Sequence, residues 1–348
     1  MQIKLSVCVP AYNRQEVLRP LLDSIFAQDY DSFEVVICED GSPQRAMIKA
    51  IAGEYELSHP GRIKYFENPE NLGYDGNIRN LIEKASGEYC FFMGNDDLMC
   101  PGALSTVASA LERHKNVGVI LRSYAAFEGS PENIRETYRY FEKETLFRPG
   151  PETVATFYKR CVVIPGLVLH RAESLKYSTP RYDGTLLYQL YLVANILNDM
   201  SGVSLPQILV LYRRGGVPDF GNSEREKGKF TPTEQTPESS LHFMEGMLRI
   251  AREVGEVRKA AIYEPILADL GNYSYPILEQ QARQKLSVFL RYYLGLAKLG
   301  FGKSKMFHFY FLALFFFGPR ISKNVINLIK NYLGHTPAIG KIAKGETF

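Results

Sequence analysis

Residues 88–97 read EYCFFMGNDD, a largely apolar run that stops at a glycine, an asparagine and two aspartates. A short run rich in aromatic residues is typical of a buried strand. The same design occurs twice upstream: LSVCVP at residues 5–10 leads into AYNR, and FEVVICE at residues 33–39 leads into DGS. We therefore predict a sheet whose strands end in polar residues.

Segments with helical spacing separate these runs. The apolar residues of 14–27 recur three or four positions apart, which predicts a helix. Further helices are expected at 44–51, 77–85, 101–114 and 186–197, and further strands at 63–66, 117–121 and 206–212. Alternating strands and helices predict an α/β fold, with a mostly parallel central sheet covered by helices on both faces.

The polar segment 215–237 is rich in Gly, Pro and charged residues and predicts a boundary. We expect a first domain over residues 1–230. Residues 231–348 are expected to form a helical, basic and aromatic C-terminal region.

In an open parallel sheet, ligands bind beyond the carboxyl ends of the strands. Asn95, Asp96 and Asp97 follow their strand directly, and adjacent carboxylates repel one another unless a cation lies beside them. Mg²⁺ or Mn²⁺, held by one or two carboxylates and by substrate phosphates, fits such a pair. The alternative is that Asp97 favours the start of the helix that Pro101 opens.

Four segments carry a resemblance to a known family: VPAYNR (9–14), ICEDGS (37–42), NPENLGYDGNIRN (68–80) and ASGEYCFFMGNDD (85–97). In this order they resemble the nucleotide-binding half of family 2 glycosyltransferases. The resemblance covers about residues 3–125 and continues more weakly to about 213. It implies that the first domain has a nucleotide-binding half (1–125) and an acceptor half (126–230). It is nearest to bacterial O-antigen sugar transferases such as the abequosyltransferases. It implies a Rossmann-like GT-A fold, a nucleotide-diphosphate sugar as donor, and a metal-dependent, inverting transfer.

The resemblance also implies roles for individual residues. Those expected to contact the donor nucleotide are Pro10, Ala11, Tyr12, Arg14, Glu39, Asp40, Gly73, Arg79, Asn95 and Asp96. Arg79 would lie near the diphosphate, and Asp97 would be the metal ligand, with Asn95 in place of the first acid of the family's DxD motif.

An inverting transfer needs a base for the acceptor hydroxyl. In the family, an acid before an apolar helix has this role, so the resemblance points to Asp183, which otherwise only caps the helix. Arg213 and Arg214 would meet the diphosphate, an anionic acceptor or solvent. His170 is expected to be structural.

The net charge of +3 conceals an asymmetry. Residues 285–348 contain ten Lys or Arg and one acid, and include the stretch MFHFYFLALFFF at 306–317. This stretch is too short to span a bilayer, which needs about 20 apolar residues. We expect it to lie on an anionic membrane surface; the alternatives are a buried helix and an oligomer contact.

We therefore expect a cytoplasmic glycosyltransferase at the inner face of the cell membrane, acting on a glycan or polyprenyl-linked saccharide in surface polysaccharide synthesis. The N-terminus is too quickly polar for a signal peptide, and no nucleic-acid motif occurs. Two alternatives remain. A nucleotidyltransferase acting on sugar phosphates should have a Gly-rich, basic loop where PAYNR stands, and a non-catalytic scaffold should show no metal-dependent nucleotide binding.

Overall fold

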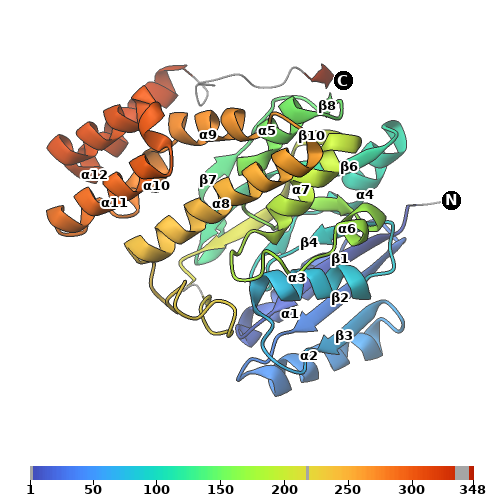
Figure 1. Ribbon diagram of the computed structural model, residues 1–348. Coiled ribbons are helices and arrows are strands. Elements are labelled where there is room, and N and C mark those ends of the chain that lie inside the picture. Colours follow the sequence, from blue (N-terminus) through green and yellow to red (C-terminus); the bar gives the residue numbers. More distant parts are fainter. Residues whose placement is uncertain (1–2, 217–218, 334–344) are drawn as a thin grey trace.

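The computed structural model describes residues 3–216, 219–333 and 345–348. One eleven-stranded sheet runs through the described residues, and helices cover both of its faces (Figure 1). Its strands are β1 Leu5–Ala11, β2 Phe33–Glu39, β3 Ile63–Glu67, β4 Tyr89–Phe92, β5 Leu98–Met99, β6 Val117–Glu128, β7 Ser130–Tyr138, β8 Thr145–Phe147, β9 Val168–His170, β10 Ser201–Arg214 and β11 Glu346–Thr347. The α-helices are α1 Gln15–Phe26, α2 Arg45–Ser58, α3 Gly73–Lys84, α4 Ala103–Arg113, α5 Pro151–Tyr158, α6 Arg171–Lys176, α7 Tyr188–Asp199, α8 Pro237–Arg258, α9 Tyr263–Asn272, α10 Tyr275–Glu279, α11 Leu286–Lys298 and α12 Lys305–Leu333.

The first half of the sheet is parallel, as the sequence predicts. Strands β3, β2, β1 and β4 lie in this order, and each neighbouring pair runs parallel. Their carboxyl ends therefore meet at one edge. This edge holds the polar residues that follow β1, β2 and β4.

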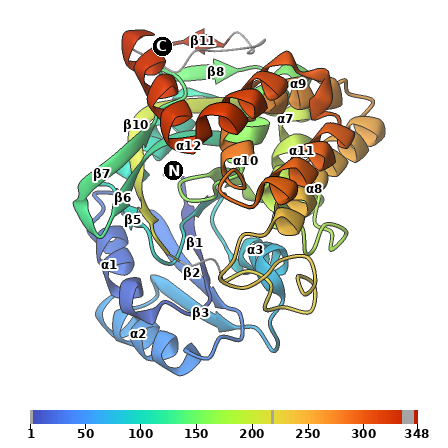
Figure 2. The same ribbon diagram turned by 90° about the vertical axis from the view of Figure 1, so that its left-hand side faces the viewer.

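The strands of this half are buried on both faces because their side chains alternate between two cores. Val7 and Val35 pack with α1, α2 and α4, whereas Cys8 and Val36 pack with α3 and α7. Figure 2 shows α1 and α3 on opposite sides of β1 and β2. The predicted α/β fold class is confirmed.

The second half of the sheet departs from the parallel expectation. The short strand β9 lies between β4 and β6 and runs antiparallel to both. The chain enters β9 through Gly166, which has a φ of 78°. Glycine adopts this backbone conformation at little energetic cost because it has no Cβ. Strand β6 is also longer than predicted, because it continues into a hairpin with β7.

The C-terminal region is helical from α8 onward, as expected, with one exception. Strand β11 pairs antiparallel with β8, so the end of the chain returns to the edge of the sheet. Helix α8 begins at Thr236, whose hydroxyl accepts a hydrogen bond from the Ser239 backbone N–H. Its apolar face shares a core with α7. The domain division at residue 230 stays a prediction.

Candidate active site

A cavity of about 600 Å³ opens at the carboxyl ends of β1, β2 and β4. Eight of the predicted site residues line it: Pro10, Tyr12, Arg14, Asp40, Gly73, Asn95, Asp96 and Asp97. Arg213 and Arg214, at the end of β10, line it too. Four predicted site residues are not among the lining residues: Ala11, Glu39, Arg79 and Asp183. The opposite wall is apolar and includes Ile164, Pro165 and Leu186.

The two aspartates after β4 have different surroundings. The Arg14 guanidinium donates to the Asp96 carboxylate, with 2.5 Å between Nη1 and Oδ2. Asp97 is buried, and its Oδ1 accepts a hydrogen bond of 2.8 Å from the Arg213 backbone N–H. Its other oxygen, Oδ2, is buried and has no hydrogen-bond partner among the described residues. Such an orphaned buried oxygen is costly unless a ligand satisfies it.

This free oxygen fits a divalent cation. Burial and the neighbouring charge of Asp96 raise the pKa of Asp97 to about 8, and a cation at Oδ2 would offset both effects. Within residues 3–216, 219–333 and 345–348, no three His, Cys, Asp or Glu side chains form a ready metal site. Asp97 would therefore hold Mg²⁺ or Mn²⁺ together with phosphate oxygens of the substrate, as Mg²⁺ sites commonly do.

The role of Asn95 follows from its hydrogen bonds to the loop after β1. Its amide Nδ2 donates to the backbone carbonyls of Tyr12 (3.3 Å) and Asn13 (3.1 Å). Asn13 and Arg14 both have positive φ, at 54° and 61°, which is an uncommon backbone for these residues. A carboxylate could not donate these bonds. The asparagine thus holds the strained first loop against the acidic tip.

The side chains of Glu39 and Asp40, the acidic pair after β2, also have different contacts. The Glu39 carboxylate accepts hydrogen bonds from the backbone N–H groups of Gly41 and Ser42, in the turn that follows β2. It also forms an ion pair with Arg45. It is fully buried and does not line the cavity. This geometry favours a role for Glu39 in shaping the turn, and its contact with the nucleotide stays a prediction.

Asp40 does line the cavity. Its Oδ1 accepts from the Asn68 side chain (2.7 Å) and from the Leu72 N–H (2.8 Å). Burial raises the pKa of Asp40 to about 6, although these two bonds favour its charged form. Its position suits the acceptance of a hydrogen bond from a bound nucleotide.

The segment after β10 closes one side of the cavity by docking on the start of α3. The Glu226 carboxylate accepts from the Tyr74 N–H (2.7 Å) and from the Gly221 N–H (2.9 Å). A Cβ at Gly73 would lie 2.5 Å from the Ser223 hydroxyl oxygen and 2.8 Å from the Glu226 carboxylate. Gly73 therefore permits the close approach of this segment.

Arg79 and Asp183 bind one another instead of a substrate. Two hydrogen bonds, of 2.6 and 2.9 Å, join the guanidinium to the two carboxylate oxygens. The Asp183 side chain is only 5% exposed. Both carboxylate oxygens are engaged and neither residue lines the cavity, which favours a positioning role for the pair. The diphosphate contact of Arg79 and the base role of Asp183 stay predictions.

Replacing Asp183 by asparagine should accordingly lower stability more than catalysis. The change leaves the partly buried Arg79 without its charged partner, so we expect the unfolding free energy to fall by about 2 kcal/mol. Turnover should stay within about tenfold of the wild type, below the about 10²–10⁴-fold that a general base contributes.

The exposed Arg19–Glu54 pair supplies the control, because E54Q removes a carboxylate from a surface pair and should barely change the melting temperature. Thermal denaturation and turnover of D183N and E54Q distinguish a positioning role of Asp183 from a role as the catalytic base. A D183N protein with the wild-type melting temperature and no activity would restore Asp183 as the base.

Two positioning residues have no signal in the sequence. The buried Asp75 accepts from the backbone N–H groups of Thr185, Leu186 and Tyr188, and so fixes the turn that presents Leu186 to the cavity. The fully buried Arg122 donates to the carbonyls of Arg160, Val163 and Pro165. It holds the loop that forms the apolar wall, and only the folded chain brings these partners together.

The structure also shows the contacts of His170, Arg213 and Arg214. His170 caps α6, its Nδ1 accepting from the Glu173 N–H at 3.3 Å, so its role is structural. Arg213 lies along the acidic tip, where its Nε donates to the Asp96 carbonyl at 2.8 Å. Arg214 pairs with Glu136 at 2.6 Å.

Comparisons with known proteins find similarity to glycosyltransferases. The family model described as glycosyl transferase family 2 matches residues 6–166. The GalNAc(5)-diNAcBac-PP-undecaprenol beta-1,3-glucosyltransferase of Campylobacter jejuni is 38% identical over 105 residues, which are 30% of this chain and 33% of that protein. Abequosyltransferase RfbV of Salmonella typhimurium is 28% identical over 113 residues, 32% of this chain and 34% of that protein. The alignments thus span about a third of these relatives.

Solved structures show the same fold. Residues 1–349 of S. aureus TarS, in complex with UDP-GlcNAc, superpose with a TM-score of 0.61 at 19% identity, covering 85% of this chain and 80% of that TarS fragment. The mannosyltransferase PcManGT from Pyrobaculum calidifontis, in complex with GDP-Man and Mn²⁺, gives a TM-score of 0.51 at 16% identity and covers 94% of this chain and 88% of its own. The chain has the fold of these solved GT-A glycosyltransferase structures, and its residues 6–166 match the family model of glycosyl transferase family 2.

Proposed function

We propose that this protein transfers a sugar from a nucleotide-diphosphate sugar to a hydroxyl of a glycan or polyprenyl-linked saccharide, with a divalent cation and with inversion at the anomeric carbon. The observation that carries the proposal is the buried, unpartnered Oδ2 of Asp97, in a cavity shared with the first loop and Asp40. The family 2 domain supports the reaction class.

Each side chain of the cavity has a task in this proposal. Tyr12 is half-buried beside Asp40 and would pack on the nucleoside, while Asp40 accepts a hydrogen bond from it. Arg14 holds Asp96 in place, and Asp97 would hold the cation. A bound Mn²⁺ or Mg²⁺ would neutralise the charge that develops on the diphosphate leaving group. The segment around Glu226 and the apolar wall would exclude water from the transferring sugar.

The acceptor class rests on the relatives. One is named for a substrate carried on PP-undecaprenol, and another is an abequosyltransferase. The first name describes a lipid-linked saccharide acceptor, and both describe the transfer of a sugar. We propose the same acceptor class for this chain, with the anomeric configuration of the product, measured by NMR, as the test of inversion.

Nucleoside binding should depend on pH through Asp40. Its pKa of about 6 means that the acceptor carboxylate is ionised above pH 6 and protonated below it. We expect nucleoside affinity to fall by about tenfold between pH 7.5 and pH 5, the value of one hydrogen bond to a charged group. Uridine, guanosine and cytidine are the ligands for this measurement, because they carry no phosphate group that titrates. The affinity of D40N for these nucleosides should not change with pH. A flat profile in the wild type would exclude Asp40 from the nucleoside site.

A thermal-shift screen tests the proposed function itself. The protein is heated with UDP-, GDP-, CDP- and dTDP-sugars, each with Mn²⁺ and with EDTA. We expect at least one donor to raise the melting temperature only when the metal is present, since a ligand that binds the native state stabilises it. If no donor and no nucleoside diphosphate shifts the transition under either condition, the cavity is not a donor site.

A further inference from the structure

The outward surfaces of α11 and α12 are unusually apolar. The described residues expose sixteen large apolar side chains, and ten of them lie on these two helices. We call these ten the C-terminal apolar face: Leu286, Leu290, Leu294, Phe309, Leu312, Phe315, Phe316, Phe317, Ile321 and Val325. Ten exposed large apolar side chains on two helices that contact one another indicate a site of interaction with another surface.

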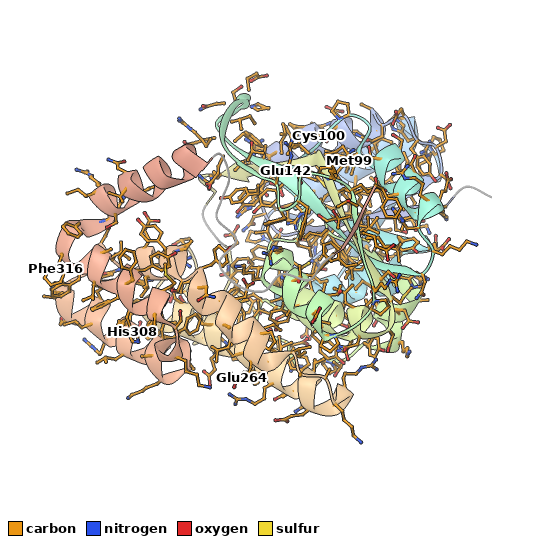
Figure 3. All side chains as sticks on the ribbon, turned by 90° about the horizontal axis from the view of Figure 1, so that it is seen from above. Met99, Cys100, Glu142, Glu264, His308 and Phe316 are labelled. Atoms are coloured by element: carbon orange, nitrogen blue, oxygen red, sulfur yellow. The ribbon has the colours of Figure 1, made fainter. Side chains whose placement is uncertain are left out.

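The sequence of α12 explains why this face remains uncovered. Phe307 and Phe311 point inward, where the ring of Tyr293 on α11 stacks against both of them, with centroid separations of 5.0 and 3.8 Å. Phe309 and Phe316 lie on the other side of the helix and are 60% and 70% exposed. The helix is thus apolar all round although only one side is buried. Figure 3 shows Phe316 at the outer margin of the molecule.

Exposed basic residues, which we call the basic rim, lie on the same segment as this face. Between residues 285 and 325 the sequence has seven Lys or Arg and no Asp or Glu. All seven are exposed: Lys285, Arg291, Lys298, Lys303, Lys305, Arg320 and Lys323. Among the described residues, only Lys303 of this set has a salt-bridge partner, Glu264 at 3.3 Å. The rim therefore presents uncompensated positive charge to whatever covers the apolar face.

The dimensions of α12 suit a helix that lies on a bilayer. Gly318, with a φ of 72°, and Pro319 interrupt it after Phe317. The uninterrupted part, residues 305–317, is about 20 Å long at 1.5 Å per residue, less than the ~30 Å hydrocarbon core. Within the described parts of the chain, no helix has both the length and the apolar character to cross a membrane.

We propose that the C-terminal apolar face and its basic rim dock on an anionic membrane surface. Aromatic side chains would enter the boundary between headgroups and acyl chains, while lysines and arginines would contact lipid phosphates. A second copy of this chain fits less well, because a symmetric contact would bring two uncompensated basic rims together. Figure 1 shows α11 and α12 together at one end of the molecule.

Vesicle sedimentation of the full chain tests this proposal without any measurement of transfer. The probes are vesicles of phosphatidylcholine alone and vesicles with about a third phosphatidylglycerol. The test variant replaces Phe309, Leu312, Phe316 and Phe317 by serine, and a second variant replaces Lys305, Arg320 and Lys323 by glutamine. We expect wild-type partitioning into anionic vesicles to exceed that of either variant about tenfold or more, and to weaken at high salt.

The double variant Leu57→Ser and Val257→Ser is the matched control, because these side chains are 84% and 78% exposed on other helices. It should sediment like the wild type. The proposal is overturned if the wild type ignores anionic vesicles, or if the test variants bind them equally well. It is also overturned if the serine variant only dissolves a dimer seen by light scattering, which would assign the face to a second copy. These outcomes leave the transferase proposal untouched.

Discussion

Replacing Asp97 by asparagine is expected to lower sugar transfer about a thousandfold or more. An amide keeps the shape of the side chain but removes the charge that would hold the cation, and such a loss costs several kcal/mol of transition-state stabilisation. Removing the buried charge also relieves its desolvation, because burial and the nearby Asp96 raise the pKa of Asp97 to about 8. The variant should therefore be at least as stable as the wild type.

The measurement combines turnover with thermal denaturation. Asp31→Asn is the control, because the Asp31 side chain is 96% exposed and lies outside the cavity. It should be as active as the wild type. A D97N protein that keeps full turnover would show that Asp97 takes no part in the reaction. Thermal denaturation shows whether an inactive D97N protein is folded, so that loss of charge is distinguished from loss of structure.

The second large effect is expected at Gly94. A Cβ at this position would lie 2.4 Å from Oδ2 of Asp97, the oxygen that has no partner. No real Cβ approaches an oxygen so closely, so alanine must displace the carboxylate from its place. Misplacement of a reacting or binding group by about 1 Å can cost about a hundredfold, and we expect G94A to lower kcat/KM by at least that factor.

Gly53 offers the matched control for the substitution at Gly94. It lies within α2, and a Cβ there would meet nothing within 4 Å. G53A should leave activity unchanged and stabilise the helix slightly, by about 0.5–1 kcal/mol. If G94A is as active as G53A, the space beside Oδ2 is not needed for catalysis.

The part of the fold that local pattern governs was predictable. The strands after which PAYNR, DGS and NDD follow are β1, β2 and β4, and the residues 14–27 form α1 within a residue at either end. These elements depend on burial periodicity, which the sequence displays directly. The convergence of the first loop, Asp40 and Asp97 on one cavity follows from parallel strand order alone.

The pairings between distant segments were not predictable. The antiparallel placement of β9 and the return of β11 to β8 join strands whose sequences carry no mark of their partners. The same holds for the Arg79–Asp183 pair, which joins residues 104 positions apart. A helix-capping acid and a catalytic base look alike in sequence, and the difference between them is the partner that folding supplies.

The most direct test of the central claim is isothermal titration of nucleoside diphosphates into the wild type and D97N, each with Mn²⁺ and with EDTA. We predict that the wild type binds one nucleoside diphosphate at least about tenfold more tightly with Mn²⁺, and that D97N loses this difference while keeping the weak, metal-free binding. Equal affinity with and without metal in the wild type, or an undiminished metal effect in D97N, would contradict the account.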